Sequence, residues 1–160
     1  MSTRASIDAF LSEPALAIIG MSRSGRKFGN AAYRALQSQG YRIYPIHPDV
    51  KSINGVRCYP DFAALPEHVQ NLLVVVPSAQ AAVAVRQAAA AGIRRVWLQQ
   101  GSESEDVMKA CRDCGVDAIA NECILMFARP AGIHKVHRWI RGAFGKLPAR
   151  GGDAAVGGGL

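Results

Sequence analysis

The chain has 160 residues, of which 49% are apolar and 19% are charged, and its formal net charge at pH 7 is +7. This length fits one domain, the composition is typical of a globular chain rather than a disordered one, and no apolar run is long enough to span a membrane. The first residues lack the apolar segment of a secretory signal peptide, and the four cysteines are unevenly spaced. We therefore expect a reduced, cytoplasmic compartment and no disulfide framework.

Apolar runs of strand length alternate with helical patterns along the chain. The predicted strands cover residues 15–19, 41–46, 72–76, 96–98 and 116–120. The predicted helices cover residues 6–11, 30–39, 78–91, 102–114 and about 131–145. Asn30, Ser78 and Ser102 are residue types that cap helix N-termini, and Glu105 completes a capping-box pattern with Ser102. The dipeptide Asn54-Gly55 predicts a tight turn.

The continuous apolar strands predict a sheet that is covered on both faces. Helical crossovers between the strands favour parallel pairing with right-handed connections. The sequence therefore predicts one α/β domain over residues 1–146, with a Rossmann-like, doubly wound, parallel five-stranded sheet and helices on both faces. The glycine-rich residues 147–160 are expected to form a flexible tail.

The fold class also predicts where a ligand binds. In sheets of this kind, ligands lie outside the carboxyl ends of the strands, near the point where the strand order reverses. The segments that follow the predicted strands are residues 20–29, 45–51, 76–78 and 99–101, and each carries small, polar or proline residues. The fold class thus predicts the location of a ligand and leaves its chemistry open.

The first of these segments, from Gly20 to Gly29, has the composition of a phosphate-binding loop. Its glycines permit close approach of the backbone, and the helix that follows offers free amides and the positive end of its dipole to an anion. Ser22 and Ser24 add hydroxyl donors, and the cations of the segment are Arg23, Arg26 and Lys27. The alternative interpretation is a solvated turn that only connects a strand to a helix.

The loop from Gly20 to Gly29 is similar to three familiar motifs but matches none of them. The dinucleotide fingerprint would need a glycine at Ser22, and an acidic residue where the second strand ends in His47-Pro48, so an NAD site is disfavoured. The P-loop would need a lysine and then a serine or threonine directly after Gly25. The nucleophile elbow would need a glycine at Ser24.

An ordered series of short motifs is similar to a known family. The motifs are Gly20-Met-Ser-Arg, Tyr44-Pro-Ile-His-Pro48, Gly55-Val-Arg-Cys-Tyr59, Val75-Val-Pro77, Trp97-Leu-Gln-Gln-Gly101 and Glu122-Cys-Ile124. Over about residues 11–127 the chain resembles the small stand-alone CoA-binding domain proteins, which are similar to the N-terminal CoA-binding domain of the succinyl-CoA synthetase α subunit. The resemblance implies a Rossmann-like fold in which coenzyme A (CoA) lies across the strand ends.

The same resemblance implies a set of CoA-binding residues. Those that would hold the phosphates are Gly20, Met21, Ser22, Arg23, Ser24, Lys27 and Phe28. Those that would lie at the nucleotide end are His47, Pro48, Lys51, Val76 and Pro77, and those along the pantetheine arm are Gln99, Gln100 and Gly101. The cationic loop and the missing ribose-binding acid suit the 3′-phosphate that CoA carries and NAD lacks.

The expected function is therefore non-catalytic binding of CoA or an acyl-CoA. The synthetase needs a second domain with a phosphorylated histidine and a partner chain, and 160 residues leave no room for these. We predict no catalytic and no metal-ligating residue, and we interpret His134 and His137 as surface or packing residues. An NAD(P)-dependent or other nucleotide-dependent oxidoreductase on the same fold is the alternative.

Two further features have competing interpretations. Cys111 and Cys114 lie at the C-terminal end of a predicted helix, where the dipole disfavours a thiolate, so inward packing is favoured over a redox pair or a zinc site with His134 and His137. The basic amphipathic helix predicted over about 131–145 is expected to dock on the domain itself, on a second copy as a homodimer, or on a protein partner. No nucleic-acid-binding module is recognised.

Overall fold

The computed structural model of the chain describes residues 2–127. The five strands of its main sheet are β1 (Ala15–Ile19), β2 (Arg42–Ile46), β5 (Asn71–Val74), β6 (Arg95–Leu98) and β7 (Asp117–Ile119). Their order across the sheet is β2-β1-β5-β6-β7, and every neighbouring pair is parallel. The predicted doubly wound, parallel five-stranded sheet is therefore confirmed.

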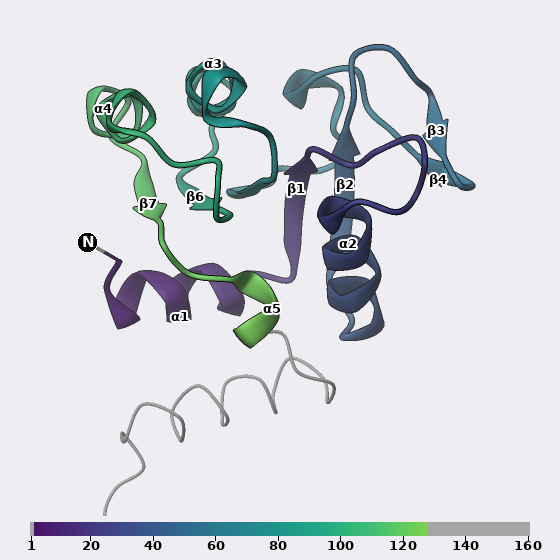
Figure 1. The fold of residues 1–160 in the computed structure, drawn as a ribbon, viewed down its shortest axis with the longest axis horizontal. Coiled ribbons are helices and arrows are strands. Elements are labelled where there is room, and N and C mark those ends of the chain that lie inside the picture. The colour runs from purple at the N-terminus through teal and green to yellow at the C-terminus, as the bar shows by residue number, and fades with distance from the viewer. Residues whose placement is uncertain (1, 128–160) are drawn as a thin grey trace, which may run out of the picture.

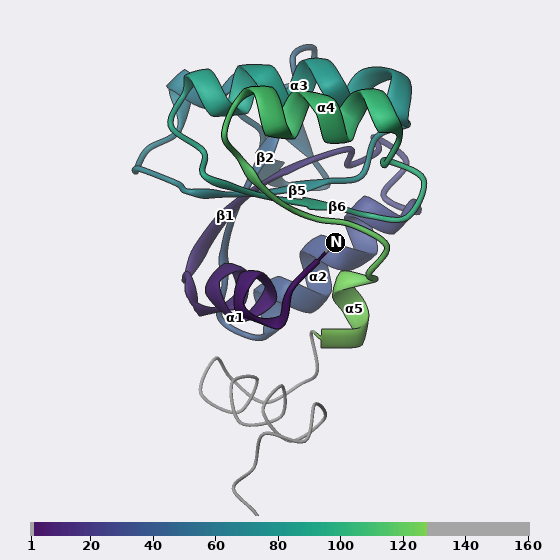
Figure 2. The same cartoon turned by 90° about the vertical axis from the view of Figure 1, so that its left-hand side faces the viewer.

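Helices cover both faces of this sheet, as Figures 1 and 2 show. The helices on one face are α3 (Ser78–Ala90) and α4 (Glu105–Asp113), and those on the other are α1 (Arg4–Ser12), α2 (Phe28–Ser38) and α5 (Ile124–Phe127). The long connection from β2 to β5 contains a hairpin of β3 (Ser52–Ile53) and β4 (Val56–Arg57), and then the 3-10 turn η1 (Phe62–Ala64). The predicted turn at Asn54-Gly55 joins the two strands of the hairpin, with φ values of 49° and 79°.

Successive residues of each strand belong to two separate apolar clusters. In β1, Ile18 packs in the cluster beneath α1 and α2, whereas Ala17 packs in the cluster beneath α3 and α4. Trp97 of β6 is fully buried and meets Phe10 and Phe127 edge to face, with ring centroids 5.4 and 5.5 Å apart. Because both faces of the sheet are buried in this way, the strands are continuously apolar in sequence.

The predicted N-caps of α2 and α3 are wrong, although both helices form. Helix α2 begins at Phe28, and Lys27 occupies its N-cap position without a capping side chain. Asn30, the predicted cap, lies inside the first turn and is 1% exposed. In α3 the N-cap is Pro77, and Ser78 is the first helical residue. Neither helix thus has a side-chain cap, and their first amides are left for other partners.

The predicted capping box of α4 is also wrong. The N-cap is Ser104, whose Oγ accepts a hydrogen bond from the backbone amide of Val107 at 3.2 Å. The hydroxyl of Ser102 instead lies 3.1 Å from the carbonyl oxygen of Val74 and 2.6 Å from that of Val76. These carbonyls are at the end of β5, where that of Val74 also accepts from the backbone amide of Gln99 at 3.0 Å, and the buried hydroxyl of Ser102 adds a donor for this strand end.

Some sequence predictions fall beyond the described residues. The basic helix expected over about 131–145 and the tail expected over 147–160 lie outside residues 2–127. Within residues 2–127, no helix combines the length and the apolar character that a membrane crossing requires.

A polar cluster ties the start of β2 to the segment before β5. Arg42 donates to both carboxylate oxygens of Glu67, from Nε to Oε1 at 2.8 Å and from Nη2 to Oε2 at 3.1 Å, and the hydroxyl of Tyr44 donates to the same carboxylate. The hydrogen bonds from Arg42 and then Tyr44 hold the pKa of Glu67 down at about 2. Because the Arg42 side chain is 54% exposed and that of Glu67 is 33% exposed, water screens much of this interaction.

We expect the substitution Glu67→Gln to lower the free energy of unfolding by less than about 1 kcal/mol at neutral pH. The pKa of Glu67 is lower in the folded state than its ordinary 4.5, so the stabilisation is present above that pH and is lost as the pH falls toward 2. Urea unfolding of both proteins at about pH 7 and about pH 2.5 measures the difference. A difference that grows in acid would contradict the prediction, and a double-mutant cycle with Arg42→Gln isolates the pair.

Candidate functional site

The strand order reverses between β1 and β5, and a cleft lies at their carboxyl ends. From β1 the chain passes to β2 on one side, and it then returns to β5 on the other side of β1. The cleft has a volume of about 400 Å³ and is lined by Gly20, Met21, Ser22, Arg23, Lys27, His47, Val75, Val76, Pro77 and Gln80. The residues that follow β1, β2 and β5 thus meet at the place where sheets of this topology bind ligands.

Two glycines let the backbones at this reversal point touch. Gly20 has φ +113°, and a Cβ on it would lie 2.4 Å from the carbonyl oxygen of Val75. A Cβ on Gly29 would lie 2.6 Å from the carbonyl oxygen of Gly20. The end of β1 is therefore packed directly against both the end of β5 and the first turn of α2, with no room for a side chain between them.

The loop from Gly20 to Gly29 is shaped by its own hydrogen bonds. The amide of Gly25 donates to the carbonyl of Ser22 at 3.0 Å, and the amide of Ser24 donates to the Ser22 hydroxyl at 3.2 Å. The hydroxyls of Ser22 and Ser24 lie 3.0 Å apart and are hydrogen-bonded to each other. The two serines, predicted as donors to an anion, thus also build the turn itself.

Asn30 attaches this loop to α2. Its Oδ1 accepts from the backbone amide of Ser22 at 3.0 Å, and its Nδ2 donates to the backbone carbonyl of Ser22 at 3.0 Å. The carboxamide is buried and therefore unscreened. The cap predicted at Asn30 is therefore wrong. A polar residue at the start of a helical pattern is typical of a cap, and no local signal in the sequence marks a contact with a residue eight positions away.

The first turn of α2 carries backbone amides without a described acceptor, and Lys27 at its N-cap lines the cleft. Among residues 2–127, no group accepts a hydrogen bond from the amides of Lys27, Phe28 and Gly29. The side chains of Arg23 and Lys27 are exposed, and neither forms an ion pair with a described residue. Free amides, a helix dipole and unneutralised cations are features that attract an anion.

His47 completes the cleft on the side of β2. Its Nδ1 accepts a hydrogen bond from the backbone amide of Asp49 at 3.1 Å. An imidazole that accepts at Nδ1 carries its proton on Nε2 when it is neutral, so Nε2 is a donor. The ring is half-buried and lines the cleft.

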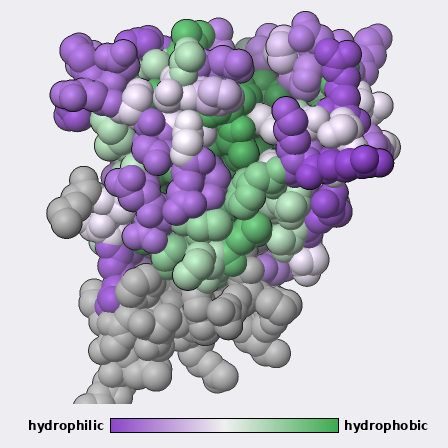
Figure 3. All heavy atoms as spheres, viewed as in Figure 1, coloured by the Kyte–Doolittle hydropathy of each residue, from purple (hydrophilic) through white to green (hydrophobic). Residues whose placement is uncertain are grey.

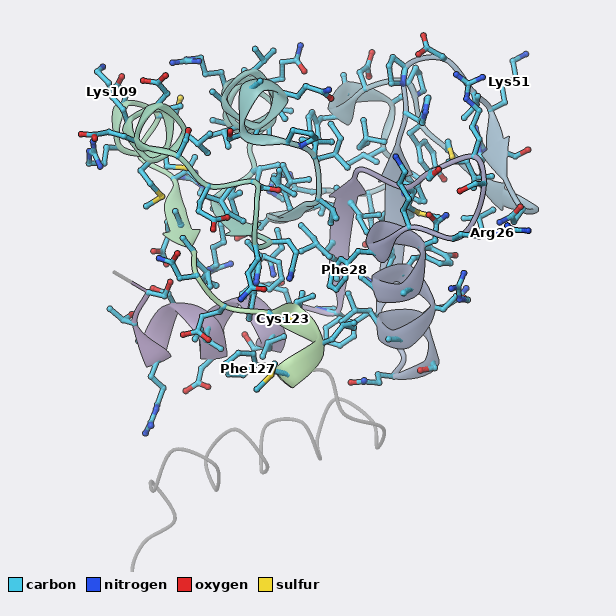
Figure 4. All side chains as sticks on the ribbon, in the orientation of Figure 1. Arg26, Phe28, Lys51, Lys109, Cys123 and Phe127 are labelled. Atoms are coloured by element: carbon cyan, nitrogen blue, oxygen red, sulfur yellow. The ribbon has the colours of Figure 1, made fainter. Side chains whose placement is uncertain are left out.

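The other residues predicted for the site lie around this cleft. Pro48 and Lys51 line a neighbouring hollow, which is described below. Phe28 is partly buried and packs against the core. In the view of Figure 4, Phe28 lies near the middle of the molecule, and Arg26 and Lys51 lie at one end. Figure 3 shows a band of apolar atoms along the middle of this same face. An extended ligand that leaves the cleft across this face would meet an apolar surface.

The segment after β6 does not line the cleft. Gln99 is 4% exposed, and its Oε1 accepts a hydrogen bond from the backbone amide of Ile124 at 3.2 Å. Gln100 and Gly101 are exposed. The cleft instead includes Gln80, which the sequence analysis missed. Its position in the first turn of the helix after β5 is the signal that could have found it, since helix N-termini at strand ends face the ligand in this fold class.

The cysteine pair does not have the environment of a reactive site. Cys111 is buried in the core under α4, and burial raises the pKa of its thiol to about 11. Cys114 is exposed at the C-cap of the same helix. Among residues 2–127, no group of three or more His, Cys, Asp and Glu side chains is placed to hold a metal ion. His134 and His137, the other members of the zinc hypothesis, lie outside these residues.

Known proteins that are similar to this chain indicate one family, and their solved structures have the fold described above. A family model described as a CoA binding domain matches residues 15–129. The chain is 24% identical to an ADP-forming acetate–CoA ligase I of Archaeoglobus fulgidus, over 69% of this chain and 18% of that protein. It is 22% identical to the α subunit of an ADP-forming acetate–CoA ligase II of Pyrococcus furiosus, over 94% of this chain and 34% of that protein. The chain thus spans about a third or less of the length of these relatives.

Solved structures of small proteins match over most of their own length. A conserved hypothetical protein of Pyrococcus furiosus is 30% identical, with a TM-score of 0.66, and the match covers 71% of this chain and 98% of that one. A hypothetical protein of Pyrococcus horikoshii is 23% identical, with a TM-score of 0.71, and the match covers 87% of this chain and 92% of that one. The second likeness shows the fold alone.

We expect Gly20→Ala to lower the free energy of unfolding by about 3 kcal/mol or more, because a side chain at this positive φ collides with a backbone carbonyl. Gly40→Ala is the matched control, since Gly40 has φ +93° and no atom within 4 Å of the added Cβ. The control substitution should lower the free energy of unfolding by only about 1 kcal/mol, because it adds backbone strain and no collision. Urea unfolding measures both, and equal losses would contradict the close approach at Gly20.

We expect Asn30→Ala to lower the free energy of unfolding by about 1–3 kcal/mol, because it leaves both backbone groups of Ser22 without their partner. Asn30→Asp should not restore the stability, since a carboxylate accepts from the amide of Ser22 but repels its carbonyl oxygen. Gln37→Ala, on the exposed side of the same helix, should cost less than about 0.5 kcal/mol. If Asn30→Asp were as stable as the unmutated protein, the two-bond attachment would be wrong.

Proposed function

Because the chain belongs to the CoA-binding domain family, we propose that it binds coenzyme A or an acyl-CoA in the cleft at the carboxyl ends of β1, β2 and β5. The observation that carries this proposal is the set of unneutralised donors at that cleft. The amides that open α2 have no acceptor among the described residues, and Arg23 and Lys27 have no acidic partner there. A diphosphate would satisfy both the amides and the cations.

The proposed phosphate loop extends from Gly20 to Phe28. In this proposal, its backbone amides and its cations bind the diphosphate, and His47 donates from Nε2 on the opposite side of the cleft. The loop is held in one shape by its serine hydrogen bonds and by Asn30. A preorganised loop of this kind loses little conformational entropy when the ligand binds.

The same residues support CoA over NAD. A dinucleotide site uses an acidic side chain at the end of the second strand to hold the ribose hydroxyls. Here β2 ends at Ile46, and His47 follows in the cleft, while the carboxylate of Asp49 belongs to the neighbouring hollow. A cationic surface without a ribose-binding acid suits a ligand that carries a phosphate on its ribose.

We propose a binding role rather than complete ligase activity. The curated relatives are ADP-forming acetate–CoA ligases, and this chain matches only 18% and 34% of the length of two of them. In the cleft itself, the residues supply hydrogen-bond donors and positive charge, which bind and orient an anionic ligand. A cytoplasmic location, and a homodimer or protein contact through residues 131–145, stay predictions from the sequence.

We expect the unmutated protein to bind CoA in calorimetry, and Lys27→Gln or Arg23→Gln to weaken that binding by about 5- to 20-fold each. The expected cause is the loss of one charge-assisted contact with a phosphate, so the affinity should also fall as the salt concentration rises. Lys109→Gln is the control, because it removes the same charge from α4, where Lys109 pairs with Asp113 at 2.6 Å. Figure 4 shows Lys109 at the end of the molecule opposite to Lys51 and Arg26.

Two outcomes would contradict this function. One is an absence of binding heat with CoA and with acetyl-CoA when the protein is folded. The other is an equal loss of affinity in Lys27→Gln and in Lys109→Gln, which would indicate a general effect of net charge rather than a contact in the cleft. Tight binding of NADPH together with no binding of CoA would favour the oxidoreductase alternative.

A further inference from the structure

A second hollow adjoins the cleft on the side of β2. Its volume is about 480 Å³, and it lies between the turn that follows β2 and strand β4. His47 lines both the cleft and this hollow, so the two adjoin at this side chain. The charged side chains that line the hollow are Asp49, Lys51 and Arg57. The hollow thus contains two cations and one carboxylate.

The β3–β4 hairpin sets the positions of both cations. The backbone carbonyl of Lys51 accepts from the amide of Cys58 at 2.9 Å, and Arg57 is paired with Ser52 across the hairpin. The guanidinium carbon of Arg57 lies 5.0 Å from the centroid of the Tyr59 ring. A guanidinium stacked on an aromatic ring keeps its edge free to donate, and that edge matches the oxygens of a phosphate.

Neither cation is neutralised by the protein. Lys51 and Arg57 are exposed, and among the described residues neither forms an ion pair. The Asp49 carboxylate lines the same hollow, yet it too is in none of the described ion pairs. The hollow therefore has a net positive charge before the imidazole of His47 is counted.

The hairpin also touches the proposed phosphate loop. A Cβ on Gly25 would lie 2.1 Å from Nδ2 of Asn54, the residue at the tip of the hairpin. The tip of the hairpin therefore lies against the loop, and the hollow lies beside the cleft. Figure 4 shows Arg26 of the loop and Lys51, the residue before β3, at the same end of the molecule.

We propose that Arg57, assisted by Lys51, binds the phosphomonoester on the ribose of CoA and so makes the protein specific for a 3′-phosphorylated adenine nucleotide. This inference rests on the proposed function, because it presumes that the diphosphate lies in the neighbouring cleft. A phosphomonoester carries about two negative charges at neutral pH and accepts several hydrogen bonds. The stacked guanidinium supplies a planar pair of donors, and the ammonium of Lys51 supplies a mobile charge.

The test compares CoA with 3′-dephospho-CoA, which differ only in that phosphate. We expect the unmutated protein to bind CoA at least about 10-fold more tightly than 3′-dephospho-CoA in calorimetry, since each lost charge-assisted contact is worth about that factor. Arg57→Gln should weaken CoA binding by about 10-fold and leave the binding of 3′-dephospho-CoA within about 2-fold of its original value. Arg57→Lys should recover part of the discrimination. Arg112→Gln, which removes the same charge from the last turn of α4, should change neither affinity.

The outcomes separate this inference from the function on which it rests. If neither nucleotide binds the unmutated protein, the proposed function fails. If both bind with equal affinity, or if Arg57→Gln weakens both equally, CoA binding stands and the phosphomonoester site is overturned. A collapse of the affinity ratio in Arg57→Gln, with circular dichroism unchanged and Arg112→Gln unaffected, supports the site.

Discussion

The candidate site depends on one close contact between backbones. Where β1 ends, Gly20 lies against the carbonyl of Val75 on one side and against Gly29 of α2 on the other, with no space for a Cβ at either glycine. This contact brings the end of the first strand, the end of the central strand β5 and the first turn of α2 to one point. A free helix N-terminus can face a cleft between strands only because the backbones meet so closely.

Around this contact, the loop divides its polar groups between two tasks. The backbone of Ser22 and the hydroxyls of Ser22 and Ser24 are used in hydrogen bonds that hold the loop, and Asn30 anchors it from inside the helix. The amides that open α2 and the cations Arg23 and Lys27 have no described partner. Groups that are satisfied internally give the loop its shape, and the unsatisfied groups are those that the proposed function assigns to an anion.

The β3–β4 hairpin extends this cationic surface away from the cleft. Its tip meets the loop at Gly25, and its strands carry Arg57 and follow Lys51. A ligand with two separate phosphate groups would be bound at two fixed positions by elements that touch each other. Such an arrangement would favour a ligand with the second phosphate over one with a single diphosphate, through the contacts that the second position adds.

The sequence by itself determined the layers of the fold and the place of the site. Apolar strands that alternate with helices specify a parallel sheet that is buried on both faces, and such a sheet binds ligands at its carboxyl ends. It did not determine the tasks of Asn30, Ser102 and Gln99, each of which satisfies backbone groups of another element. Only the tertiary structure decided those, because a buried polar side chain bonds whichever backbone group packing brings within reach. The position of Arg57 beside the cleft was also decided by the tertiary structure. It depends on the contact between the hairpin tip at Asn54 and the loop at Gly25, which lie far apart in the sequence.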